Sequence, residues 1–207
     1  MCTDTIINGF TAFGTVAVAI LAIWGDWLKA TLIPVRLRLV PHNTRGTLTM
    51  FNIPRPVIFY HLKVVNDRRW VPARNCRVVL KALASRNADL QFQSVPLPVP
   101  FQFSWAPAES TPAFVTVQKE QVLDFGFIAE PTHENPGITR FTPALYSYPN
   151  DFRGFVGPGE AVRYSLEVEA DGFVSPTYAV FEVEWDGVWN PDLDQMANHL
   201  VIRQVAA

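Results

Sequence analysis

The sequence contains little cysteine. Only two of its 207 residues are cysteines, Cys2 and Cys76. They lie on either side of an apolar N-terminal segment that could cross a membrane, so the two thiols are poorly placed to pair with each other. A domain without intrachain disulfides is more typical of a reducing compartment than of an oxidising one.

Charged residues are also scarce, and they carry no surplus of positive charge. Asp, Glu, Lys and Arg make up 17% of the chain, against about 25% in a typical soluble protein. The formal net charge is −2, whereas a basic footprint is the usual first sign of nucleic-acid binding. We therefore expect no nucleic-acid partner.

Sequence motifs of catalysis are missing as well. The histidines are scattered, and there is no HxxxH or CxxC pair, no glycine-rich phosphate loop and no GxSxG turn. Cys76 alternates with Val78 and Leu80, which predicts a buried thiol rather than a reactive one. We expect no enzyme, no metal site and no cofactor.

An uncharged apolar segment dominates the N-terminus. Residues 5–25 contain no charged side chain, and a helix of this length spans roughly 31 Å, close to a hydrocarbon core about 30 Å thick. Asp4 is the only charged residue before the segment, whereas a cleaved signal peptide would carry positive charge there. Trp24 and Trp27 lie at the end of the segment, as interfacial aromatic residues do. We predict a single transmembrane helix within residues 1–33, with the lipid bilayer as the partner of residues 5–25.

The flanking charges predict the orientation of this helix. Lys29, Arg36, Arg38 and Arg45 follow it, and no Lys or Arg precedes it. Cytoplasmic flanks of membrane spans are enriched in Lys and Arg, so we predict a single-pass protein of the inner (plasma) membrane, with its N-terminus outside and its domain in the cytoplasm. The alternative is a signal anchor whose domain faces the periplasm.

Small residues recur at every fourth position of the segment, at Thr11, Thr15 and Ala19. They would stack on one helical face and let two helices approach closely in lipid. The face makes the chain a candidate homo-oligomer, although the tighter GxxxG pattern is absent.

Residues 34–207 have the pattern of a β domain. Pro34 ends helical structure, and apolar and polar residues then alternate with a period of two. The expected strands are 35–39, 57–66, 75–83, 101–105, 114–117, 122–129, 162–170, 178–185 and 200–205. Because turn-forming residues separate them and no long amphipathic helix intervenes, we predict a mainly β fold, an antiparallel β-sandwich, with a β-barrel as the alternative.

Two groups of short motifs stand out in this domain. Residues 62–66 (LKVVN) are followed by 72–80 (PARNCRVVL), and residues 157–160 (GPGE) precede an alternating strand from Tyr164 to Val168. These stretches resemble the core of bacterial immunoglobulin-like domains of the cell-adhesion-related (CARDB-like) type, although Arg69 stands where a loop glycine is usual. The resemblance implies an immunoglobulin-like β-sandwich that serves binding.

One loop concentrates basic and aromatic residues. Arginines surround one tryptophan in this candidate binding site, which comprises Arg68, Arg69, Trp70, Arg74 and Arg77. Arginine pairs with phosphates and carboxylates and stacks on aromatic rings. The loop could contact anionic lipid headgroups, a nucleotide or an acidic protein, or it could be a solvated hairpin loop whose arginines pair with nearby acids.

Carboxylates form a second pattern. Glu167, Glu169, Glu182 and Glu184 alternate with apolar residues on two strands, and on one face of a hairpin they would repel each other. We therefore expect basic neighbours, namely Arg163, or Arg77 and Lys81.

Trp185 and Trp189 flank a turn and could form an exposed aromatic platform. Asn190 and Pro191 after them fit the N-cap and first position of a short helix.

These features together predict a membrane-anchored, non-catalytic interaction module that binds a protein partner. Two alternatives remain open. One is a membrane effector gated by an anionic, nucleotide-type ligand, and the other is a periplasmic adhesion or envelope module.

Overall fold

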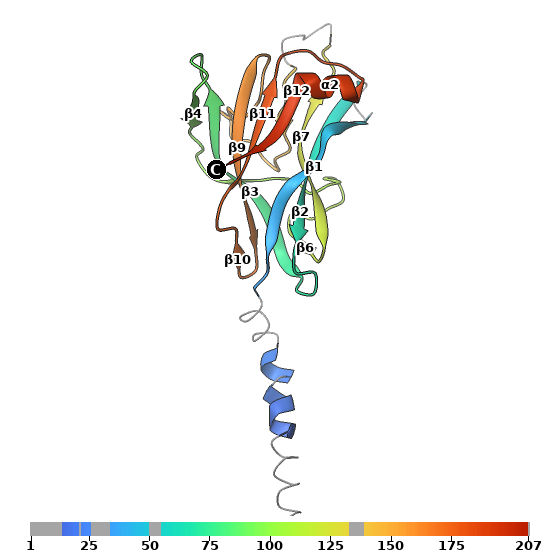
Figure 1. Cartoon of the computed structure of the whole chain (residues 1–207), viewed down its shortest axis with the longest axis vertical. Helices are drawn as coiled ribbons and strands as arrows, with labels where there is room; N and C mark the ends of the chain where they lie inside the picture. Colours follow the sequence, from blue (N-terminus) through green and yellow to red (C-terminus); the bar gives the residue numbers. More distant parts are fainter. Residues whose placement is uncertain (1–13, 21, 26–33, 50–54, 133–138, 207) are drawn as a thin grey trace, which may run out of the picture.

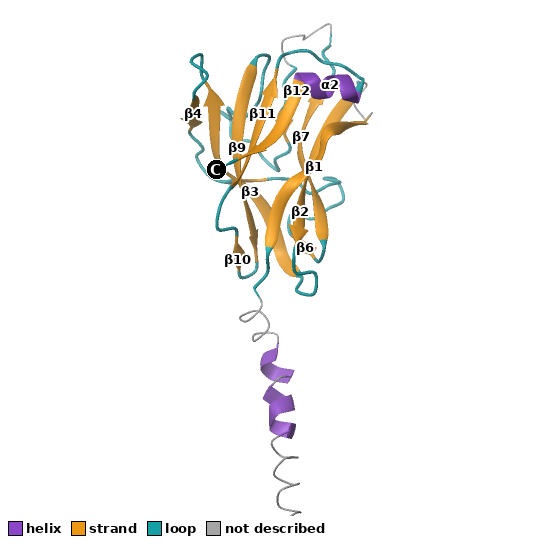
Figure 2. Cartoon of the chain, viewed as in Figure 1, coloured by secondary structure: helices purple, strands orange, loops and turns teal. Residues whose placement is uncertain are grey.

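A computed structural model describes residues 14–20, 22–25, 34–49, 55–132 and 139–206. Figures 1 and 2 show a short helical segment at one end and a β-rich body that holds nearly all of the other described residues. The strands are β1 (Leu37–Thr49), β2 (Val57–Asn66), β3 (Ala73–Arg86), β4 (Phe92–Val95), β5 (Phe101–Gln102), β6 (Val115–Val117), β7 (Glu120–Ala129), β8 (Thr142–Pro143), β9 (Glu160–Ala170), β10 (Phe173–Val174), β11 (Ala179–Trp185) and β12 (Leu200–Val205).

The strands form two antiparallel sheets. The smaller sheet has the order β1-β2-β7-β8, and the larger has the order β12-β11-β9-β3-β4, with β10 added to β9 and with β5 and β6 added to β3. Neither sheet closes into a barrel among the described strands. The predicted mainly β, sandwich-like fold is therefore confirmed, and the β-barrel alternative is wrong.

Alternation along the strands builds the core between the sheets. In β2, Ile58, Tyr60, Leu62 and Val64 are buried, whereas the residues between them are partly exposed. Phe125 of β7 lies at the centre of an aromatic cluster, with ring centroids 5.8 Å from Phe103, 5.7 Å from Phe141, 5.5 Å from Tyr164 and 5.7 Å from Phe181. Such ring pairs add to the stabilisation that comes from the buried area itself.

A β-bulge in the smaller sheet determines which side chains leave this core. Tyr60 pairs with Gly126, but the next residue, His61, pairs with Asp124, so Phe125 is the extra residue of β7. The bulge lets the Phe125 side chain enter the core and places Asp124 beside His61 on the outer face of the sheet. Bulges commonly redirect a side chain in this way.

The described helical residues near the N-terminus are 14–20 and 22–25, and most are exposed. Within the described ranges, no helix is long and apolar enough to cross a membrane, so these ranges do not confirm the predicted transmembrane helix. Residues 5–13 and residue 21 of the predicted span lie outside the described residues.

The helix α2 (Leu193–His199) starts later than the sequence predicts. Asp192 is its N-cap and accepts hydrogen bonds from the backbone amides of Asp194 and Gln195, whereas the Asn190 side chain accepts one from the amide of Asp192. The predicted N-cap at Asn190 is wrong because the Asn190 side chain closes a turn that comes before the helix.

Candidate functional site

The arginine-rich loop between β2 and β3 is held in a fixed shape by Asn66. The Asn66 side chain is buried and donates hydrogen bonds to the backbone carbonyls of Val71 at 2.8 Å and Val117 at 3.2 Å. Its oxygen accepts one from the backbone amide of Arg68 at 3.0 Å. The amide of Val71 closes a turn onto the Arg68 carbonyl at 2.9 Å. The loop is therefore ordered by one buried polar side chain.

Four of the five predicted binding residues lie together on or beside this loop. The Arg68 guanidinium donates a hydrogen bond to the carbonyl of Pro34 at 2.9 Å. Arg69 and Arg74 are exposed and form no ion pair within the part of the chain that the structure describes. Trp70 is 71% exposed. These side chains leave cationic and aromatic groups available to a partner.

Arg77 lies apart from this group. It reaches across to its paired residue Glu169 on β9, with a nitrogen–oxygen distance of 2.6 Å, and its guanidinium lies 5.6 Å from the ring centroid of Phe114. Because these contacts engage its charge, Arg77 is a structural partner of the acidic stripe, the group formed by Glu167, Glu169, Glu182 and Glu184.

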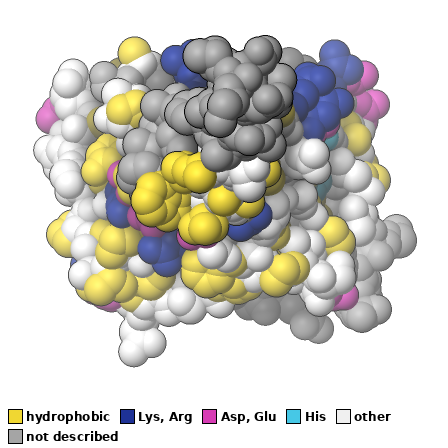
Figure 3. All heavy atoms as spheres, turned by 90° about the horizontal axis from the view of Figure 1, so that it is seen from below, with side chains coloured by type: hydrophobic (Ala, Val, Ile, Leu, Met, Phe, Trp, Pro, Cys, Tyr) yellow, Lys and Arg dark blue, Asp and Glu magenta, His cyan; other side chains and the backbone are white. Residues whose placement is uncertain are grey.

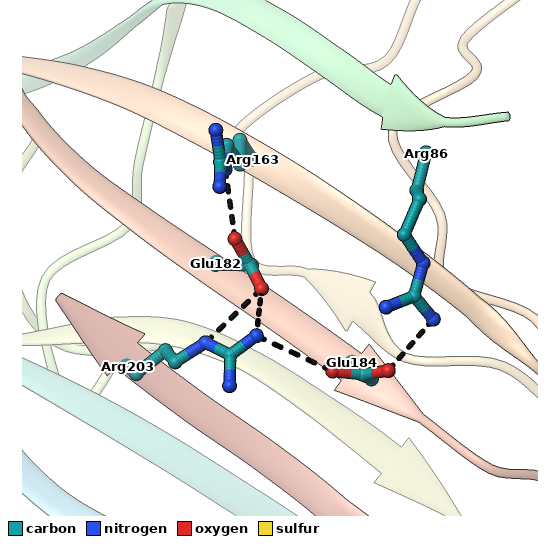
Figure 4. Close-up of polar contacts among 5 residues, drawn as sticks. All are labelled: Arg86, Arg163, Glu182, Glu184 and Arg203. Atoms are coloured by element: carbon teal, nitrogen blue, oxygen red, sulfur yellow. Dashed lines mark hydrogen bonds and ion pairs between the residues drawn. The ribbon is translucent and has the colours of Figure 1, made fainter. Parts of the chain in front are cut away.

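The acidic stripe is paired with basic residues throughout. Lys81 contacts Glu167 at 2.7 Å and Glu169 at 2.9 Å. Glu182 accepts hydrogen bonds from Arg163 and Arg203, and Glu184 contacts Arg86 at 2.7 Å (Figure 4).

The expected partners Arg163, Arg77 and Lys81 are thus confirmed. Arg86 and Arg203 are additional partners. Arg203 lies on β12 next to β11, whereas Arg86 on β3 reaches Glu184 of β11 across the intervening strand β9.

Burial of Glu182 tends to raise the pKa of its carboxyl, but the hydrogen bonds from Arg163 and Arg203 outweigh this effect and hold the pKa below its usual value. The Arg163 guanidinium also lies 3.7 Å from the centroid of the Phe92 ring. The stripe is therefore a network of ion pairs that joins strands β12, β11, β9 and β3 of the larger sheet, with its charges already paired inside the chain.

The predicted aromatic platform does not form. Trp185 is 1% exposed and donates its indole hydrogen to the carbonyl of Val188, and Trp189 packs against the core. Because Trp185 is buried and Trp189 is partly buried, the two rings do not form the exposed surface that the sequence predicted. Of the predicted helix-pairing face, Thr15 and Ala19 are helical and exposed, whereas Thr11 lies outside the described residues. Helix pairing stays a prediction.

A groove that the sequence did not reveal lies on the outer face of the smaller sheet. It has a volume of about 630 Å³. Phe59 and His61 of β2 lie along it with Val122 and Asp124 of β7, and the second half of β1 forms one wall. The opposite wall is the loop 106–109, which is joined to β7 by a hydrogen bond from the Ala106 amide to the Val122 carbonyl. Most of the exposed lining is apolar.

A polar pair lies in this groove. The Nε2 atom of His61 is 3.2 Å from a carboxylate oxygen of Asp124, and both side chains are largely buried. A carboxylate fixes the orientation of an imidazole, so His61 presents its other nitrogen in a defined direction. His42 and Glu109 lie on opposite walls. The groove can therefore hold an apolar group and hydrogen-bond a polar one beside it.

The His61–Asp124 pair resembles two parts of a nucleophilic triad, which also needs a hydroxyl or thiol hydrogen-bonded to the imidazole. Within the described residues, no hydroxyl or thiol forms such a bond with His61. No group of three or more His, Cys, Asp or Glu side chains in the same ranges could hold a metal ion.

Comparison with known proteins gave no match, either to a protein-family model or to a curated protein sequence.

Proposed function

We propose that this chain is a non-catalytic binding module tethered to the inner membrane, and that its cytoplasmic β-sandwich receives a segment of a protein partner in the groove over β2 and β7. The groove carries this proposal. Its volume of about 630 Å³ falls within the range of about 300–1,000 Å³ that is usual for ligand sites.

The lining supports a protein segment as the occupant. Phe59 and Val122 offer apolar surface, which would accept an aliphatic or aromatic side chain of the partner. The His61–Asp124 pair lies beside them and can hydrogen-bond a backbone or side-chain polar group. The second half of β1 and the loop 106–109 rise on either side and would hold an extended segment between them.

The tether and its direction have separate support. The apolar residues 5–25 have the length of a membrane span, and the basic residues lie on their C-terminal side. Cys76 is a free, buried thiol, which agrees with a reducing compartment. The resemblance to immunoglobulin-like domains supports the binding role, since it suggests a scaffold that binds other molecules.

Site-specific photocrosslinking tests the groove. A photoreactive amino acid at Thr47 or Glu109, on the two walls, should give the same crosslinked protein in living cells, whereas one at the exposed Gln93 of β4 should not. The substitution Val122→Arg should abolish both adducts by filling the groove. Adducts that persist in Val122→Arg, or that form equally from Gln93, would refute the groove as the binding site.

Thiol labelling tests the tether and its direction. In a Cys2→Ser background, Ser94→Cys places an exposed thiol on β4. We expect the full chain to stay with washed membranes and the new thiol to react with a membrane-impermeant reagent only after permeabilisation. Labelling of intact spheroplasts would instead place the domain in the periplasm, and release of the chain by high salt would contradict a spanning tether.

A further inference from the structure

Several segments distant in sequence meet at the end of the domain where the chain enters it. The Arg68 guanidinium bonds to the Pro34 carbonyl, and the Asp67 amide bonds to the Arg36 carbonyl at 2.9 Å. The amide of Asn66 bonds to the carbonyl of Lys119 at 2.8 Å. Strand β3 begins here too, and the Arg74 carbonyl accepts the amide of Asp171 at 2.9 Å. The residues at this end therefore form one continuous surface.

This surface has an excess of positive charge. We define the basic face as Arg36, Arg68, Arg69, Trp70, Arg74 and Lys119. None of its five cations forms an ion pair within the described ranges.

The acids nearby offset only part of the charge of these five cations: Asp171 keeps its negative charge beside Arg74, and Asp67 also interacts electrostatically with Arg36. Asp67 is already engaged by two hydrogen bonds of 2.8 Å from Arg38, and these bonds hold the pKa of its carboxyl below the usual value. Asp171 receives a hydrogen bond from Asn75. Viewed from this end, Lys and Arg side chains show at several places on the surface, some of them beside Asp and Glu side chains (Figure 3).

Trp70 adds an aromatic group to the basic face. Its side chain is 71% exposed, so it contributes little to the core. Val174, which follows the β9–β10 turn that contacts Arg74, is also 60% exposed. Tryptophan prefers the interface between water and lipid, and arginine binds phosphate with a planar pair of donors. An exposed tryptophan surrounded by arginines is therefore better suited to the headgroup layer of a membrane than to bulk water.

We propose that the basic face lies against an anionic membrane surface and so holds the domain in one orientation. This inference rests on the proposed tether. Residue 34 follows the apolar segment by only nine positions, and nine residues reach at most about 30 Å. Because Pro34 is bonded to Arg68, a chain anchored through residues 5–25 keeps the basic face within that distance of the headgroups. Binding of small counterions from solution would not place this end of the domain, rather than another, against the membrane.

Hydrogen exchange on the full chain in lipid nanodiscs tests the proposal. Among the described residues, the amides of Arg69 and Trp70 have no hydrogen bond, so they should exchange rapidly when the loop faces water. We expect the peptide that covers residues 67–75, through the amides of Arg69 and Trp70, to exchange more slowly in discs with 30% anionic lipid than in neutral discs. In 0.5 M salt the protection should weaken, since exposed charges are then screened.

Charge removal gives the sharper result. Each basic residue near an anionic membrane surface raises the affinity of a protein for that surface about fivefold. The double substitution Arg69→Gln/Arg74→Gln should therefore reduce the ratio of docked to undocked domain on the order of 25-fold. Arg153→Gln is the matched control, because Arg153 is also exposed and free of ion pairs in the described structure but lies in the loop before β9, away from the basic face.

Flotation of the same proteins separates the tether from the docking. A chain that floats with neutral vesicles but shows equal exchange in neutral and anionic discs overturns the docking and leaves the tether intact. A chain that floats only with anionic vesicles overturns the tether, and with it the proposed orientation, although it shows that the domain itself binds anionic lipid. Protection from exchange that appears only when an acidic protein is added also overturns the assignment to lipid. So does a loss of protection in Arg153→Gln as large as that in the double substitution.

Discussion

Glu182 should be the most sensitive carboxylate of the larger sheet. Its side chain is 2% exposed and accepts hydrogen bonds from Arg163 at 2.7 Å and from Arg203. The substitution Glu182→Gln keeps the shape of the side chain but removes its charge. A glutamine amide has one oxygen and one NH₂ group, so one of the two arginines would then face a donor instead of an acceptor.

The size of the effect follows from these contacts. Hydrogen bonds to charged groups contribute about 1.5–3 kcal/mol each, but both arginines are partly exposed and can turn to water, which lowers the cost. We expect Glu182→Gln to reduce the free energy of unfolding by about 2 kcal/mol, which lowers Tm by about 4–8 °C in a chain of this size. Glu184→Gln is the control, because Glu184 is 34% exposed and a surface pair contributes about 0–1 kcal/mol.

The effect should depend on pH in a defined direction. The arginines hold the pKa of Glu182 below its value in the unfolded chain. Its contribution to stability is therefore complete at neutral pH and is lost as the pH falls through the folded-state pKa. Thermal unfolding of the full chain in one non-ionic detergent, at pH 7 and again below pH 4, measures both quantities. The reasoning is refuted if Glu182→Gln destabilises no more than Glu184→Gln, or if its effect is unchanged in acid.

Three further substitutions or treatments test the core. Gly126→Ala should cost about 1–3 kcal/mol in urea denaturation, because a Cβ there would lie 2.3 Å from Phe141 and 2.7 Å from the Thr142 carbonyl; a neutral result would contradict the packing. Tyr60→Phe should leave stability unchanged or raise it by about 1 kcal/mol, since the buried Tyr60 hydroxyl has no hydrogen-bond partner in the described structure, and a clear loss would reveal one. Burial raises the pKa of Cys76 to about 12, so in a Cys2→Ser background its thiol should react with an aromatic disulfide reagent at pH 8 only after unfolding; rapid reaction of that folded variant would disagree.

Strands with one buried face could be predicted well from the sequence. The expected strand 57–66 coincides with β2 (Val57–Asn66), because β2 alternates clearly between the core and the outer face. The expected strand 122–129 lies within β7 (Glu120–Ala129), although the bulge interrupts the alternation there and leaves residues 123–126 all buried. The first strand was predicted too short. It continues to Thr49 because its polar residues still pair with β2, with register shifts on either side of Asn43. The Asn43 side chain donates a hydrogen bond to the carbonyl of Gly46 within this irregular stretch.

The site was predicted only in part, for a physical reason. Arg68, Arg69 and Trp70 are neighbours in sequence, so their common location needed no knowledge of the fold. His61 and Asp124 become neighbours only through the pairing of β2 with β7 and the bulge at Phe125. A one-residue difference in that register would turn Asp124 toward the core. Pairing registers of distant strands leave no local mark in a single sequence, which is why the groove could not be anticipated.

The pairing of β3 with β9 has a consequence for synthesis of the chain. About 70 residues separate the two strands, so a ribosome that adds about 5–20 residues per second needs several seconds to supply β9 after β3 has emerged. During that interval one edge of β3 lacks its final neighbour. Arg77, Lys81 and Arg86 on this strand are then unpaired cations, and charges on an open edge discourage pairing with other nascent chains. The same arginines and lysine that later bind the glutamates would thus first keep newly made chains apart.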